Sequence, residues 1–327
     1  MIRKLAFVSL FAAVATSSEC VAQRSAEPLT AEQRAILIDS IARALNARYV
    51  FPDVAARMDA DLHARAKRGE FDASTDASSF AQLLTTDLQA LSHDRHLRVR
   101  VGSPGGPGGP ASRADGPSGV FGRTERLPDD VAYVDILSFG FPAESVREDA
   151  SRVMSAVADA KALILDLRSN GGGDPFTVAL VASYLFGDKP VHINSLYFRP
   201  ADRTDDFYTD PNVDGKKFGP DKPVFVLTSA RTFSGAEEFA YDLQTQKRAT
   251  VVGETTGGGA NPGGPVRLPY DLTLFVPTGR AINPITKTNW EGVGVKPDVQ
   301  AAADDALDVA IRLARQAVGA PAARPIQ

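Results

Sequence analysis

The sequence predicts an α/β fold whose main sheet is largely parallel. From about residue 120 onward, apolar β-prone runs alternate with segments that carry apolar residues at helical spacing. The run at 162–167, ALILDL, is apolar almost throughout, which is typical of a strand buried on both faces. Strand–helix–strand units of this length imply parallel pairing. A helical pattern precedes them, so we also expect a small N-terminal helical subdomain.

The helical subdomain is expected over residues 23–95. Thr30, with Gln33 three residues later, is typical of a capped helix start, and residues 54–66 predict a second helix. A third helix is predicted because apolar residues recur with the 3.6-residue period at Phe80, Leu83, Leu84, Leu88 and Leu91.

A strand and a linker are expected next, over residues 96–119. Residues 97–101, LRVRV, alternate between apolar and charged side chains, which predicts a strand with one polar face. Residues 103–119 are so rich in Gly and Pro that they can form neither a helix nor a central strand. The α/β core then follows over residues 120–320, and residues 321–327 form a tail. The strands of the α/β core are predicted at 131–136, 162–167, 223–228 and 249–252. Its helices are predicted at 174–186, from 234 and at 303–318.

The first residues are typical of an exported protein. A basic start precedes an apolar run over residues 5–15 that is too short to span a bilayer. Small residues before a cleavage point after Ala22 complete a signal peptide over residues 1–22, so we expect a periplasmic or secreted protein without a membrane span. An uncleaved anchor is one alternative. A lipoprotein modified at Cys20 is another, which the neighbouring Glu19 disfavours.

Composition excludes several kinds of function. The net charge is −4 and no basic patch stands out, which disfavours nucleic acid as a partner. Cys20 is the only cysteine, so a chain cleaved after Ala22 would have neither a disulfide nor a cysteine nucleophile.

Ser234 is the candidate nucleophile. It lies in a turn between a predicted strand and a predicted helix, where unpaired backbone N–H groups and the helix dipole stabilise an oxyanion. Ser234 with Glu237 three residues later also fits a capping box, in which the hydroxyl merely caps the helix. The residue alone does not decide between these interpretations.

Three further segments carry candidate groups. The glycine-rich turn at 168–173 could point N–H groups at an anion or be a plain tight turn, and its spacing matches no nucleotide-binding motif. Of the histidines, His93 and His96 lie at a junction from helix to strand, whereas His63 and His192 have no evident catalytic context. Residues 289–298 contain Glu291, a carboxylate that could orient a histidine.

Together these segments resemble a known family. SHDRHLRV, DLRSNGGG, TSARTFSGAEEFAYDLQ with RATVVGETTGGGANP, and NWEGVGVKPD resemble, in order, motifs of the C-terminal-processing (tail-specific) and tricorn serine peptidases. The likeness is greatest to the branch related to interphotoreceptor retinoid-binding protein, and it extends over roughly residues 30–315. The resemblance implies a Clp-protease/crotonase-type α/β superhelix core with a small N-terminal helical subdomain.

The resemblance also implies roles for individual residues. Ser234 matches the nucleophile, and His96, or else His93, matches the general base. Glu291 matches the acid of the triad. The backbone N–H of Gly235, with that of Gly171 or Gly172, matches the oxyanion hole. It implies a peptide or protein substrate, needs neither a metal nor an organic cofactor, and leaves homo-oligomerisation open.

The sequence departs from the family pattern at several points. Gly259 stands where the bacterial tail-specific proteases have the lysine of a Ser–Lys dyad, and Asn261 stands where the related branch often has histidine. No segment resembles the inserted peptide-binding PDZ domain. We therefore expect a Ser–His–Glu peptidase. A non-catalytic binder of an apolar, retinoid-like or fatty-acid-like ligand is the rival hypothesis. An acyl-CoA enzyme is disfavoured because CoA chemistry is cytosolic.

Overall fold

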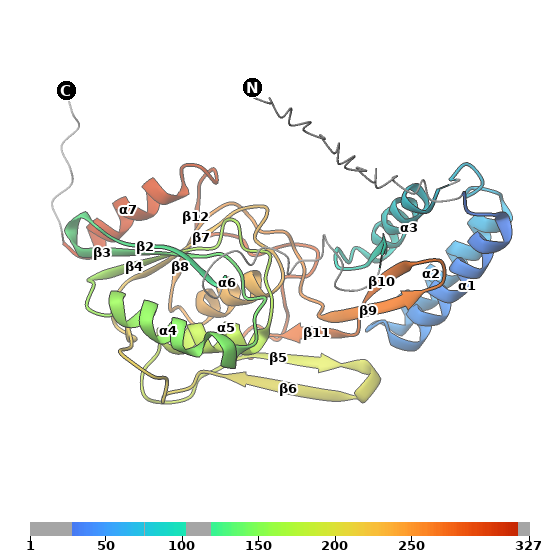
Figure 1. Cartoon of the computed structure of the whole chain (residues 1–327). Coiled ribbons are helices and arrows are strands. Elements are labelled where there is room, and N and C mark those ends of the chain that lie inside the picture. Colours follow the sequence, from blue (N-terminus) through green and yellow to red (C-terminus); the bar gives the residue numbers. More distant parts are fainter. Residues whose placement is uncertain (1–27, 75, 103–118, 320–327) are drawn as a thin grey trace, which may run out of the picture.

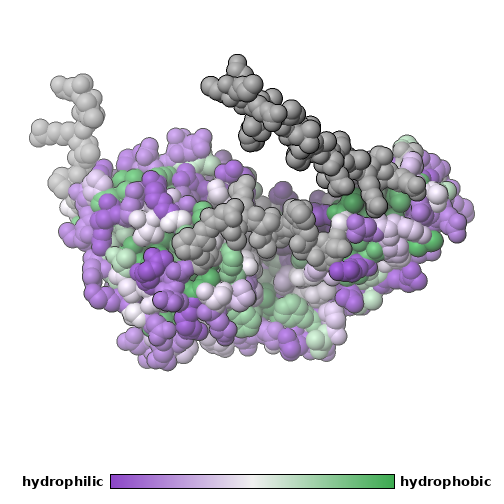
Figure 2. All heavy atoms as spheres, in the orientation of Figure 1, coloured by the Kyte–Doolittle hydropathy of each residue, from purple (hydrophilic) through white to green (hydrophobic). Residues whose placement is uncertain are grey.

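The computed structural model describes residues 28–74, 76–102 and 119–319 and confirms the predicted α/β fold. The expected signal peptide, nearly all of the Gly/Pro linker and the C-terminal tail lie outside these residues. None of the described helices has the length and apolar character that crossing a membrane requires. On the face drawn in Figure 2, hydrophilic residues cover most of the described surface, with apolar residues scattered among them.

The first lobe consists of helices packed on a small antiparallel sheet (Figure 1). Its helices are α1 (Ala31–Arg48), α2 (Pro52–Lys67) and α3 (Ala77–Ser92). Its sheet has the order β1 (Arg98–Val101), β10 (Leu272–Pro277), β9 (Gly263–Leu268). The three predicted helices are confirmed, and the Thr30 hydroxyl caps α1 by accepting from the N–H of Gln33 at 3.1 Å.

The second lobe is built on a six-stranded sheet of order β12-β8-β7-β4-β3-β2. Every neighbouring pair is parallel except β2 with β3. The strands are β2 (Phe121–Leu127), β3 (Val131–Ile136), β4 (Ala162–Asp166), β7 (Val224–Thr228), β8 (Thr250–Gly253) and β12 (Val299–Gln300). A 3-10 turn, η1 (Pro128–Asp130), joins β2 to β3.

Helices cover both faces of this sheet (Figure 1). One face packs against α4 (Ala143–Val157), α5 (Pro175–Ser183) and α6 (Gly235–Thr245), and the other against α7 (Ala306–Ala317). Alternate residues of β4 point into the two cores: Leu163 and Leu165 into the first, Ala162 and Ile164 into the second. Burial on both faces explains why this strand is apolar almost throughout.

The segment after β8 joins the two lobes. The β9–β10 hairpin completes the sheet of the helical lobe, because β10 pairs with β1. Next, β11 (Gly279–Ile282) pairs with β5 (His192–Phe198), which also pairs with β6 (Arg203–Tyr208) across the turn η2 (Arg199–Ala201). Of these strands, β6, β9, β10 and β11 were not predicted from the sequence. The chain therefore passes from the main sheet to the helical lobe and back before it reaches residues 289–298 (Figure 1).

Candidate active site

Ser234 lies in a sharp turn between β7 and α6. Its backbone has φ 55° and ψ −124°, a conformation that a residue with a side chain adopts only at a cost. A strained serine between a strand and a helix is the geometry of a nucleophile elbow, which exposes the hydroxyl. The pairing with Glu237 is also present, since the N–H of Ser234 donates to Glu237 Oε2 at 2.8 Å.

Glu237 does more than cap the start of α6. Its fully buried carboxylate accepts hydrogen bonds from the N–H of Gly258 at 2.6 Å and from the N–H of Gly259 at 2.8 Å. The Thr256 hydroxyl also donates to it. Burial raises the pKa of Glu237, while these donors oppose that shift. One side chain thus ties the Ser234 turn to the loop that follows β8.

The glycine-rich loop after β4 packs directly against the Ser234 turn. Gly172 has φ +95°, and a Cβ atom there would lie 2.5 Å from the nitrogen of Gly235. Only glycine permits this approach. The N–H of Phe233 donates to the carbonyl of Asn170 at 3.1 Å, and the Ser229 hydroxyl donates to the carbonyl of Arg168 at 2.6 Å. The two loops therefore form one backbone framework.

This framework determines which amides are available for an anion. The N–H of Gly172 already donates to Asn170 Oδ1 at 2.8 Å, and Gly171 does not line the cavity beside Ser234. Gly173 and Gly235 do line it, and within the described chain their N–H groups donate to no other group. Sequence analysis did not single out Gly173, because the position of an amide relative to the serine depends on the fold.

His93 and His96 have different surroundings. His93 ends α3 in a left-handed conformation (φ 59°) and is exposed. The His96 side chain is only 11% exposed, and its ring centroid lies 4.6 Å from that of Phe233, the residue before Ser234. It also stacks on Phe275 of β10 at 5.9 Å. Of the two candidate bases, His96 is therefore the one packed against the serine turn.

Gly259 makes room for His96. A Cβ atom at Gly259 would lie 2.3 Å from Cζ of Phe233 and 2.7 Å from Cε1 of His96. A side chain at this position would have to push Phe233 or His96 aside. The absence of a dyad lysine and the presence of a buried histidine are thus two aspects of one packing arrangement.

Two carboxylates approach the imidazole of His96. Asp94, His96 and Glu291 form a cluster. One carboxylate oxygen or ring nitrogen from each residue lies within 4.8 Å of those of the other two. Nδ1 of His96 and Oε1 of Glu291 are both buried without a hydrogen-bond partner, whereas Oε2 of Glu291 accepts from the N–H of Ala260 at 2.5 Å. Buried polar atoms are normally paired, and a hydrogen bond from Nδ1–H to Oε1 would satisfy both atoms.

Asp94 was missed by the sequence analysis. It is 1% exposed, and its carboxylate accepts from Tyr49 Oη at 3.2 Å, from Asn261 Nδ2 at 2.9 Å and from the N–H of His96 at 3.0 Å. Its Oδ1 lies 4.0 Å from His96 Nδ1. Asn261, where histidine is common in the related branch, thus holds Asp94 in place. Because Asp94 already accepts three hydrogen bonds, Glu291 has the freer oxygen for the imidazole.

Burial controls the protonation of these groups. It lowers the pKa of His96 to about 4, and the nearby Arg98 acts in the same direction. Burial and then repulsion from Asp94 raise the pKa of Glu291 to about 8. Burial also raises the pKa of Asp94. At neutral pH the imidazole is therefore neutral, as a general base must be.

The same three residues are the one group of the described chain whose ligand atoms could hold a metal ion. Their hydrogen bonds favour another role, however. Asp94 accepts from three donors and one oxygen of Glu291 accepts from a backbone amide. These bonds orient the carboxylates toward protein donors, as in a hydrogen-bonded catalytic unit.

A small cavity of about 40 Å³ adjoins Ser234. Its walls are mostly apolar, with one carboxyl group: Gly173, Pro175, Leu196, Ser234, Gly235, Glu238, Gly259, Ala260, Pro262, Ala281 and Trp290. The candidate nucleophile therefore borders a pocket large enough for a small side chain only.

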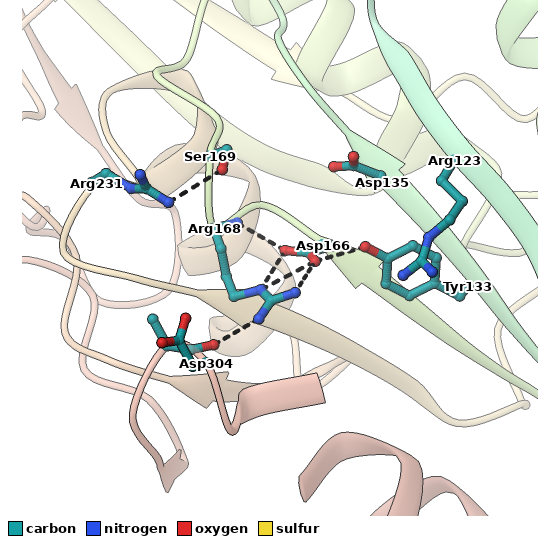
Figure 3. Close-up of a pocket in the computed structure, with 9 residues that line it drawn as sticks. Arg123, Tyr133, Asp135, Asp166, Arg168, Ser169, Arg231 and Asp304 are labelled. Atoms are coloured by element: carbon teal, nitrogen blue, oxygen red, sulfur yellow. Dashed lines mark hydrogen bonds and ion pairs between the residues drawn. The ribbon is translucent and has the colours of Figure 1, made fainter. Parts of the chain in front are cut away.

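A larger cavity of about 340 Å³ lies at the carboxyl ends of β3 and β4 (Figure 3). Its floor is an ion pair in which Arg168 donates through Nε and Nη2 to Asp166, and Tyr133 donates to the same carboxylate at 2.7 Å. The Arg168 hydrogen bonds hold the pKa of Asp166 below its usual value against the effect of burial. No histidine lines this cavity. The Asp166–Arg168 ion pair fixes the start of the loop that carries Gly172 and Gly173.

Comparison with known proteins agrees with this picture. The model of peptidase family S41 matches residues 130–301, and that of the N-terminal domain of Peptidase_S41 in eukaryotic IRBP matches residues 26–133. The chain is 29% identical over 169 residues to carboxyl-terminal-processing peptidase 2, chloroplastic, of Arabidopsis thaliana. That match includes 51% of this chain and 31% of the relative, so the chain spans about a third of the relative's length.

Solved structures share the fold. A protein from Parabacteroides merdae superposes with a TM-score of 0.61 at 18% identity, covering 86% of this chain and 96% of that one. The photosystem II D1 C-terminal processing protease gives 0.52 at 17% identity, covering 87% and 98%. Tricorn protease gives 0.61 at 14% identity, covering 88% of this chain and 37% of the other. These matches confirm the fold that the sequence resemblance implied.

Proposed function

Because the chain belongs to peptidase family S41, we propose that it is a serine peptidase in which Ser234, His96 and Glu291 act as one catalytic unit. The observation that carries the proposal is the clustering of the His96 and Glu291 side chains, each with a buried, unpaired polar atom, while the imidazole packs on Phe233 beside the strained Ser234 turn. Nucleophilic catalysis of this kind needs a nucleophile, a base and an acid that are held close together.

The proposed reaction is acyl transfer from a peptide bond to water. Ser234 Oγ attacks the carbonyl carbon and His96 takes its proton, while Glu291 stabilises the imidazolium. The N–H groups of Gly235 and Gly173 hold the oxyanion. His96 then gives the proton to the leaving amine, and the C–N bond breaks. Water attacks the acyl-enzyme by the same steps, which release the acid and restore Ser234.

The substrate is proposed to be a peptide or protein met outside the cytoplasm, in the periplasm or after secretion. The rival hypothesis, an apolar-ligand binder, is disfavoured by size. Pockets for drug-sized ligands measure about 300–1,000 Å³. The cavity beside Ser234 measures about 40 Å³, and the larger one is lined mainly by charged residues.

Digestion of an unbiased peptide library by the purified chain tests the proposal. Ser234→Ala should reduce turnover by ~10³-fold or more, because loss of the nucleophile disables the whole unit. Ser169→Ala is the matched control, since within the described chain its hydroxyl contacts only Arg231, at 3.4 Å. Undiminished cleavage by the Ser234 variant would show that the hydroxyl is only a helix cap.

A further inference from the structure

The cavity beside Ser234 has one polar wall that the proposed mechanism does not use. Glu238 follows Ser234 by one helical turn, and its N–H donates to the carbonyl of Ser234 at 3.0 Å. Residues four apart on a helix lie on one face, so Glu238 lines the same cavity as the serine. The remaining walls are apolar side chains or backbone.

Glu238 is buried and incompletely paired. The residue is 6% exposed, and its Oε1 has no hydrogen-bond partner in the described chain. Asn194 is fully buried beside it. Its two polar atoms form no well-aligned hydrogen bond, although its amide is close enough to Glu238 to lower the pKa of that carboxyl group. Asp242, one turn further along α6, has one unpaired oxygen. Of these three side chains only Glu238 lines the cavity, and a buried carboxyl oxygen is normally paired, so a hydrogen-bonding group that enters the cavity is a fitting partner for it.

The chemistry of the carboxyl group fits such a partner. Burial raises the pKa of Glu238 to about 7, and Asp174 at the start of α5 adds repulsion, whereas Asn194 opposes the shift. Near neutral pH the group is therefore present both as a hydrogen-bond donor and as an acceptor. A hydroxyl group both donates and accepts, so it can pair with either form.

The size of the cavity limits what can enter. A cavity needs roughly 10–15 Å³ of accessible volume to hold one water molecule. A cavity of about 40 Å³ therefore holds only a few heavy atoms. Because Ser234, Gly235 and Gly173 also line it, a side chain in this cavity belongs to the residue whose carbonyl Ser234 would attack.

From this arrangement we infer that Glu238 is the specificity-determining residue of the substrate pocket. It selects peptides with a small hydroxyl side chain, serine or threonine, directly before the scissile bond. This inference rests on the proposed peptidase function, since it concerns the same site. Large aliphatic, aromatic and long basic side chains are excluded by volume, and small apolar ones leave Glu238 without a partner.

The test uses peptides that differ only at the residue before the scissile bond: Ser, Thr, Ala, Val and Phe. Thr and Val form the decisive pair, because they match in shape and differ by one hydroxyl. We expect kcat/KM to favour Thr over Val by at least ~10-fold, since sites built to bind a hydroxyl discriminate strongly against analogues that lack it. Phe should not be cleaved. Equal kcat/KM for Thr and Val in the unaltered protein overturns the inference.

Variants of Glu238 provide a second test of the assignment. Glu238→Leu should bring the Thr/Val ratio close to one, and Glu238→Gln should keep Thr ahead of Val but lower the ratio, because an amide lacks the charge of the carboxylate. Glu125→Gln, an exchange on the distant strand β2, is the matched control and should leave the ratio unchanged. If Glu238→Leu does not fold, the comparison of Glu238→Gln with the unaltered protein stands alone, and an unchanged ratio in every folded variant contradicts the assignment.

Labelling with a fluorophosphonate separates the two proposals. Normal labelling of Ser234 with no Thr/Val discrimination refutes the pocket assignment and leaves the peptidase proposal intact. Absence of labelling and of any cleavage refutes the peptidase proposal, and the pocket assignment falls with it.

Discussion

At the scale of single residues, Gly259 and His96 show how one position can exclude one catalytic strategy and permit another. A lysine at Gly259 would occupy the space of the imidazole, because even a Cβ atom there would lie 2.7 Å from Cε1 of His96. The sequence showed that the lysine was absent. The reason for its absence became apparent only when the fold brought residues 96, 233 and 259 together.

Gly259→Ala should therefore lower activity without preventing folding. The added methyl group must push Phe233 or His96 aside, and a displacement of about 1 Å in a catalytic group can cost ~10²-fold in rate. The control is Gly264→Ala in β9, where nothing lies within 4 Å of the new Cβ atom. Equal kcat/KM for both variants and the unaltered protein would contradict the packing argument.

In the proposed mechanism, the protonation of the His96–Glu291 pair sets the pH dependence of activity. Burial raises the pKa of Glu291 to about 8 and lowers that of His96 to about 4, so near pH 7 the pair holds one proton. When Glu291 loses this proton, a neutral imidazole lies beside a carboxylate that can stabilise the imidazolium. We expect kcat/KM to rise through about pH 8, and not through the pH of about 6.5 at which an unperturbed histidine titrates.

Glu291→Gln tests which group is responsible. An amide cannot ionise, so this variant should lose the rise near pH 8 and keep a low, flat activity above about pH 5. Circular dichroism should show a retained fold. A variant that keeps the rise near pH 8 would show that the titrating group lies elsewhere.

At the scale of elements, the sequence predicted those parts whose signal is local. The helices α1 to α3 and the buried strands β3, β4, β7 and β8 follow from apolar periodicity. The strands β9 to β11 were missed, because residues 263–265 read GGP and because their partners β1 and β5 are remote in the sequence. For the same reason the Tyr49–Asp94–Asn261 network was not foreseen, since its members meet only in the folded chain.

Glu237 is the clearest case of a side chain that joins elements. It holds the start of α6 to the loop at 255–259 through hydrogen bonds to Ser234, Gly258 and Gly259. Glu237→Gln would place an amide NH₂ among backbone donors. Since a hydrogen bond to a charged group contributes about 1.5–3 kcal/mol, we expect a loss of roughly that size in the free energy of unfolding.

Urea unfolding measures this loss, with Glu125→Gln on β2, a partly exposed residue, as the control. Activity should fall as well, because the loop that keeps Gly259 beside His96 is released. A midpoint equal to that of the control would show that the carboxylate is not a structural tie.

At the scale of the whole molecule, the proposed site unites segments from both lobes. His96 lies between α3 and β1 of the helical lobe, Ser234 lies between β7 and α6, and Glu291 follows β11. Arg95 extends the contact, since its Nη1 donates to the carbonyl of Gly257 at 2.6 Å. The resemblance of separate motifs predicted these residues, but the contacts that bring them together depend on the β9–β10 hairpin, which crosses between the lobes (Figure 1).

The rate at which a fluorophosphonate labels Ser234, compared between His96→Ala and His93→Ala, tests the central claim most directly. Both changes remove one imidazole within the same short segment, so each controls for the other. We predict that His96→Ala nearly abolishes labelling, whereas His93→Ala leaves it close to that of the unaltered protein. Labelling that survives the loss of His96 and disappears with the loss of His93 would contradict the assignment of the base.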